Sequence, residues 1–190
     1  GRMEVKAAAL RLATIIAKTY LPRIPAVSDM ARARQIAMQD LQRVRATTPT
    51  LPVSQFLRLH LPITLYLNDL VNLGCSSATY TLNDKTVLSF QSSGMQFLAE
   101  ICRWFAQAQD PDYQSQGDGA TDAIESQLLV QFLSQILGAV RVCLSIRHAP
   151  SLIQDTSEIL QLLLSQGFIR DKVALKRLLK PIGTYVEEAF

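Results

Sequence analysis

Apolar residues recur with the helical period of 3.6 along most of this 190-residue chain, and this periodicity limits the possible folds more than any other feature. The first such stretch covers residues 4–19. Its stripe positions share one helix face: Val5, Ala8, Ala9, Leu12, Ile15, Ile16 and Thr19. We therefore expect an amphipathic helix over residues 4–19 that buries this stripe.

Prolines separate the first helix from the second. Pro22 and Pro25 end the first helix. Ser28 or Asp29 then caps a second helix that continues to about Arg45. The stripe that this second helix is expected to bury comprises Met30, Ala33, Ala37, Leu41 and Val44.

A third helical region covers about residues 53–73. Pro62 lies inside it and predicts a kink or two short helices, and Gly74 is well placed to end it. Apolar groups lie on nearly all sides of this region and of residues 128–146. We expect two central buried helices; the alternative is that one face meets a partner or neighbouring repeats.

Four further helices are expected, over residues 93–107, 122–147, 150–165 and 171–190. The core side of the first comprises Phe97, Ile101, Trp104 and Phe105. Gly138 is a position where the second can bend, and Pro150 and Gly167 mark the two ends of the third. Pro181 is expected to end or kink the last helix.

Two interpretations fit residues 79–90. A hairpin would use Asn83-Asp84 as its turn, whereas a helix would begin at Lys85 with one of these residues as its cap. We favour the helix because the surrounding chain is helical. For the whole chain we expect about seven helices, with a polar, flexible loop at 109–120 and no parallel sheet.

The segment Glu4-Val5-Lys6-Ala7-Ala8-Ala9-Leu10-Arg11-Leu12 resembles the second helix of a HEAT repeat. That helix has an acidic residue, Val, a basic residue and then closely spaced alanines, which let a neighbouring helix approach. The resemblance implies an all-α, HEAT/armadillo-like α-solenoid. An irregular orthogonal helical bundle is the alternative.

The domain organisation is expected to be simple. Residues 1–3 resemble a cloning scar, and residues 4–190 are expected to form a single α-helical domain. The sequence stops at Phe190 inside a predicted helix, so we expect this domain to be a piece of a larger protein. A fragment favours the solenoid, because solenoid repeats contact only their neighbours and tolerate excision.

Three cysteines indicate a reducing compartment. Cys75, Cys102 and Cys143 are an odd number without a close pair, which fits the cytoplasm or nucleus better than secretion. We expect thiols in apolar helices to act as small hydrophobes. Residues 128–146 contain Gln131 and Arg141, so we expect a buried helix there rather than a membrane span.

The sequence contains no recognisable catalytic or metal-binding motif. His60 and His148 are the only histidines, and the structural interpretation of both is favoured over catalysis. Clustered Cys or His ligands for zinc and glycine-rich phosphate loops are absent from the sequence. We therefore expect no enzymatic activity, no cofactor and no metal.

Positive charge is concentrated in the first 50 residues, which hold nine Lys or Arg and three Asp or Glu, although the net charge of the chain is only +3. One cluster lies on the second helix and another near the C-terminus. The candidate partner-binding cations are Arg32, Arg34, Arg43, Arg45, Lys172, Lys176 and Lys180. Ordinary solvated helix faces are the alternative interpretation.

These features favour a protein-interaction scaffold and complex subunit that binds a partner helix or peptide, with an acidic surface, on a partly basic helical face. A nucleic-acid-binding helical module of a genome-maintenance or RNA-processing scaffold is one alternative. An enzyme with an unrecognised helical fold is another.

Overall fold

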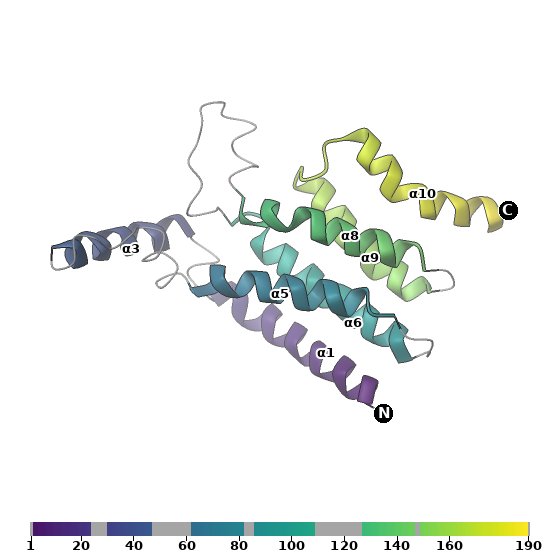
Figure 1. The fold of residues 1–190 in the computed structure, drawn as a ribbon, viewed down its shortest axis with the longest axis horizontal. Coiled ribbons are helices and arrows are strands. Elements are labelled where there is room, and N and C mark those ends of the chain that lie inside the picture. The colour runs from purple at the N-terminus through teal and green to yellow at the C-terminus, as the bar shows by residue number, and fades with distance from the viewer. Residues whose placement is uncertain are drawn as a thin grey trace.

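The computed structural model describes residues 2–23, 30–46, 62–81, 86–108, 127–146 and 149–189. The elements in these ranges are seven α-helices and two short 3-10 helices, which confirms the all-α prediction (Figure 1). The elements are α1 (Arg2–Tyr20), η1 (Leu21–Arg23), α3 (Met30–Arg45), α5 (Pro62–Ala78), α6 (Thr86–Phe105), η2 (Leu128–Phe132), α8 (Leu133–Leu144), α9 (Pro150–Ser165) and α10 (Lys172–Ala189).

Six of these helices stack in two layers. In one layer α6 packs between α1 and α9, and in the other α8 packs between α5 and α10. The pairs α5–α6 and α8–α9 join the layers, while α3 lies apart from the stack (Figure 1). This arrangement is an α-solenoid, as the resemblance to a HEAT repeat implied.

The core is centred on α6, because this helix contacts α1, α5 and α9. Phe97, Ile101 and Phe105 are almost completely buried, as predicted, and Trp104 is half-buried. Burial of each such side chain contributes about 1.5–3 kcal/mol. Helix α6 begins at Thr86, so the helical interpretation of this region is confirmed.

Polar contacts tie the same helices together. The Arg11 guanidinium donates to Ser93 Oγ at 3.2 Å and to Ser89 Oγ at 2.6 Å, which links α1 to α6. Arg103 of α6 pairs with Glu100 on its own helix and with Glu158 on α9. These contacts fix the register between neighbouring helices in one layer.

The prediction for α1 was wrong about which face is buried. Val5, Leu12, Ile15 and Ile16 are 49–70% exposed, whereas Ala7, Leu10 and Ala17 are buried. Helix α1 packs against α6, and the buried Ala7, Leu10 and Ala17 share one side of α1, so the large exposed apolar side chains lie on the opposite side.

Gly74 was also misinterpreted, because α5 continues through it to Ala78. A Cβ atom at Gly74 would lie 3.1 Å from the Leu98 Cβ, so the glycine allows α5 and α6 to pack closely. Pro62 is the first residue of α5, a position that suits its fixed φ. Residues 53–61 lie outside the described residues.

Two further helix boundaries differ from the prediction. The helix expected over 122–147 is represented by η2 and the shorter α8, and the Leu128 N–H donates to the Ala108 carbonyl at 2.7 Å. That bond ties the start of η2 to the chain just after α6. Helix α10 continues through Pro181, which therefore does not end it.

Other predicted features agree with the structure or fall outside it. Helix α9 has the predicted bounds, and Gly167 follows it with a φ of 77°. Helix α8 runs through Gly138 without interruption. The predicted loop at 109–120, the first residues of the helix predicted from residue 122, and both histidines lie outside the described residues.

The close approach of α6 to the end of α5 generates a stability prediction. A Cβ atom at Gly94 would lie 2.6 Å from the Ala78 backbone nitrogen. Gly94→Ala is therefore expected to lower the free energy of unfolding by about 1–3 kcal/mol, the usual cost of overpacking. Urea unfolding monitored by circular dichroism measures the change.

The matched control is Gly138→Ala in α8. A Cβ atom at Gly138 would meet nothing within 4 Å. The free energy of unfolding of this variant should therefore rise by about 0.5–1 kcal/mol, because alanine has a better helix propensity than glycine. Equal stability changes in the two variants would contradict the assignment of a tight α5–α6 contact at Gly94.

Candidate protein-binding surfaces

The first predicted basic cluster lies on α3. Arg43 and Arg45 are exposed, and Arg43 Nη1 lies 3.2 Å from Asp40 Oδ1. Exposed pairs of this kind contribute little stability, so the pair leaves Arg43 accessible to another carboxylate. Arg32 and Arg34 lie on the same helix, and their side chains are outside the described part of the structure.

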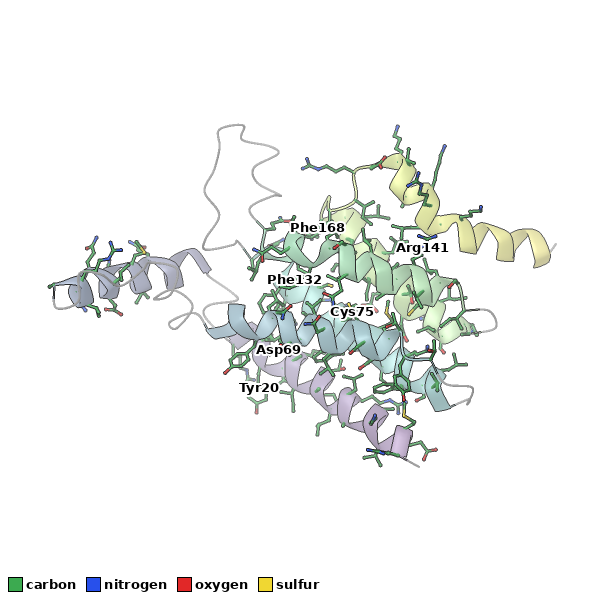
Figure 2. All side chains as sticks on the ribbon, viewed as in Figure 1. Tyr20, Asp69, Cys75, Phe132, Arg141 and Phe168 are labelled. Atoms are coloured by element: carbon green, nitrogen blue, oxygen red, sulfur yellow. The ribbon has the colours of Figure 1, made fainter. Side chains whose placement is uncertain are left out.

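The second predicted cluster lies on α10. Lys172, Lys176 and Lys180 are exposed and are spaced four residues apart, so they follow one side of this helix. Leu178 is buried, and α10 packs on α8. Nitrogen-tipped side chains project from α10 away from the stack (Figure 2). This column therefore lies on a helix that the core supports.

The structure does not bring the two clusters together. Helices α3 and α10 lie toward opposite ends of the long axis of the molecule (Figure 1). A single short peptide cannot contact both, so each cluster has to be treated as a separate surface.

The structure adds a groove that sequence reasoning did not predict. This α1–α5 groove has a volume of about 470 Å³ and lies between those helices, with residues near the start of α6 beside it. Its lining residues are Lys6, Ala9, Leu10, Ala13, Leu73, Ser76, Ser77, Tyr80 and Phe90. The closely spaced alanines of α1 were the available sequence signal for this groove. The α5 residues that line it with them lie 60 or more positions further along the chain.

One end of the α1–α5 groove is closed by aromatic side chains and a cation. The Tyr80 and Phe90 ring centroids lie 5.8 Å apart in a nearly perpendicular arrangement, and Lys6 Nζ lies 5.8 Å from the Tyr80 centroid. The groove is thus largely apolar with a positive charge at this end.

A second groove, of about 420 Å³, lies between α5 and α8. Gln135 Nε2 donates to Asn72 Oδ1 at 2.6 Å across it, and Ser76 and Thr79 add hydroxyl groups. Leu73 and Ser76 line both grooves, so one side of α5 forms a ridge between them.

All three cysteines are buried in the core (Cys75 is labelled in Figure 2). Burial raises the pKa of Cys75 and of Cys143 to about 12, and it also raises the pKa of Cys102. The Cys143 Sγ donates to the Ala78 carbonyl at 3.2 Å. The thiols therefore serve as small core side chains, as predicted, rather than as nucleophiles.

Among the residues that the structure describes, three or more His, Cys, Asp or Glu side chains do not gather where they could hold a metal ion. Within those residues, each helix is too short or too polar to cross a membrane.

The two-layer stack and its exposed helical faces define a HEAT-type helical repeat. The chain belongs to the family of the Laa1/Sip1/HEATR5 HEAT repeat region, whose family model matches residues 63–189. HEAT repeats typically form non-enzymatic scaffolds that mediate protein interactions. No curated protein and no solved structure shows significant similarity to this chain.

The matched range begins at α5, so it does not include α1. Helix α1 nevertheless occupies the same layer as α6 and α9, which are the second helices of their pairs. The segment whose sequence resembles the second helix of a HEAT repeat therefore has the corresponding position in the stack.

Burial of the thiols generates a labelling prediction. At pH 8 the folded protein should react with iodoacetamide about 100-fold or more slowly than the urea-unfolded protein, because alkylation needs an accessible thiolate. Mass spectrometry of timed reactions measures this ratio. Rapid alkylation of Cys75 or Cys102 in the folded protein would contradict the core described above.

The raised pKa of the buried thiols makes the free energy of unfolding depend on pH. Unfolded thiols titrate near 9.0, whereas Cys75 in the folded chain titrates near 12, so the unfolded state loses its protons first. Below pH 9 the thiols are protonated in both states and their contribution to the free energy of unfolding is fully present. The free energy of unfolding should then fall as pH rises from 9 to 12. Replacing Cys75 and Cys143 by alanine should make this fall smaller, and an unchanged slope would contradict the assignment.

Proposed function

We propose that this chain is a non-catalytic scaffold that binds a partner protein through basic helical surfaces. The observation that carries the proposal is the exposed lysine column on α10, a helix that packs on the core through α8. A preformed surface of this kind loses little conformational entropy when a partner binds.

The proposed partner is a helix or extended peptide that carries acidic residues. Lys172, Lys176 and Lys180 extend over about 12 Å along the helix axis, a length that suits several carboxylates on one partner segment. On α3, Arg43 and Arg45 are the described members of the second proposed surface. These cations would steer the partner and supply charged hydrogen bonds rather than most of the affinity.

Charge reversal tests this proposal. We expect replacement of Lys172, Lys176 and Lys180 by Glu to weaken binding of a captured partner at least tenfold, because attraction becomes repulsion. The same change at Arg32, Arg34, Arg43 and Arg45 tests the second surface. Affinity capture followed by titration of the purified partner measures both effects.

The matched control reverses exposed cations outside both clusters, at Lys18 and Arg141. This double reversal should leave the partner affinity within about twofold of that of the unchanged protein, since salt screens exposed charges that lie far from an interface. Partner affinities that are unchanged by both cluster reversals would overturn the assignment of these residues. Binding to DNA that weakens steeply with added salt would support the nucleic-acid alternative instead.

A further inference from the structure

Helix α1 carries an apolar seam on its exposed side. Five exposed positions follow one another at spacings of three and four residues, which is the repeat through which two helices pack. The residues of this α1 seam are Val5, Ala9, Leu12, Ile16 and Tyr20. The seam covers 15 residue steps, or about 22 Å of helix axis.

The α1 seam continues into the α1–α5 groove. Ala9 belongs to both, and Ala13, one turn further on, lines the groove. Across the groove Leu73 is 44% exposed, so α5 adds an apolar wall to the seam. An incoming helix that packs on the seam would place one row of side chains into this groove. The combination fits a helix better than a flat surface or a small molecule.

Charge decides among the possible occupants. Lys6 lines the groove and lies next to Val5, at a position that flanks the seam. Arg2 and Lys6 are exposed on the first turns of α1, and α3 has four cations and one acidic residue. Neither α3 nor the α1 of a second copy complements this surface, whereas a helix with flanking carboxylates does.

We propose that the α1 seam and the α1–α5 groove bind an amphipathic helix of a partner protein whose apolar face is flanked by carboxylates. The inference rests on the proposed function only in taking the partner to be a protein. It uses none of the seven candidate partner-binding cations on α3 and α10, so the two proposals can fail separately.

A synthetic helix provides the probe. A fluorescein-labelled 18-residue peptide with leucines at alternating spacings of three and four residues, and glutamates at the flanking positions, is titrated with the whole 190-residue chain. A sister peptide has lysine in place of every glutamate. Fluorescence anisotropy should show saturable binding of the acidic peptide, with the basic peptide at least tenfold weaker.

Two matched pairs of variants locate the binding site. Lys6→Glu should weaken binding of the acidic peptide at least fivefold, whereas Lys18→Glu should not. Lys18 is also exposed on α1 but lies outside the groove. Leu12→Asp should weaken binding of the acidic peptide at least tenfold, whereas Ile15→Asp should have little effect on it. Leu12 and Ile15 have similar exposure, and only Leu12 belongs to the seam.

Several results would overturn the inference. These are no saturable binding of the acidic peptide, equal affinity for the two peptides, or equal effects within either variant pair. A dimer in sedimentation analysis that Leu12→Asp dissociates would assign the surface to a second copy. Circular dichroism and urea unfolding verify that each variant is folded.

Discussion

Burial of α6 between three other helices is the interaction on which the rest of this structure depends. The buried side chains of α6 form the centre of the core, and α1, α5 and α9 pack around them. Because an isolated helix is marginally stable in water, the neighbouring helices owe much of their order to this packing. The surfaces on α1 and α5 are held in place by the same contacts.

Small residues determine how closely the helices approach. Gly94 and Gly74 allow α6 to contact α5, and Ala7 and Ala17 lie on the side of α1 that packs against α6. The consequence on α1 is that its larger apolar side chains face outward. The same close packing that stabilises the stack therefore produces the seam that we propose as a docking surface.

Much of the helical architecture is predictable from local patterns, whereas the orientation of individual helices is not. The period of 3.6 and the pair Pro150 and Gly167 predicted α9 with its correct bounds, since these signals act within one helix. The apolar stripe of α1 predicted a helix correctly but the wrong buried face. Which face is buried depends on α6, a distant segment of the chain against which α1 packs.

The candidate sites likewise differ in whether local sequence patterns predict them. Exposed cations on α10 could be predicted, because charged columns at a spacing of four residues stay on helix surfaces. The α1–α5 groove could not, since Ala13 and Leu73 are brought together only by the stacking of two layers. Gly74 was misread for the same reason: its role is set by Leu98 on another helix rather than by its neighbours in the chain.

Hydrogen exchange of the native chain tests the central position of α6 most directly. If α6 is the centre of the fold, its amides between Met95 and Phe105 should exchange only through global unfolding, with protection matching the free energy from urea unfolding. Amides of α3, which lies apart from the stack, should exchange much faster. Exchange in α6 as fast as in α3 would contradict this account.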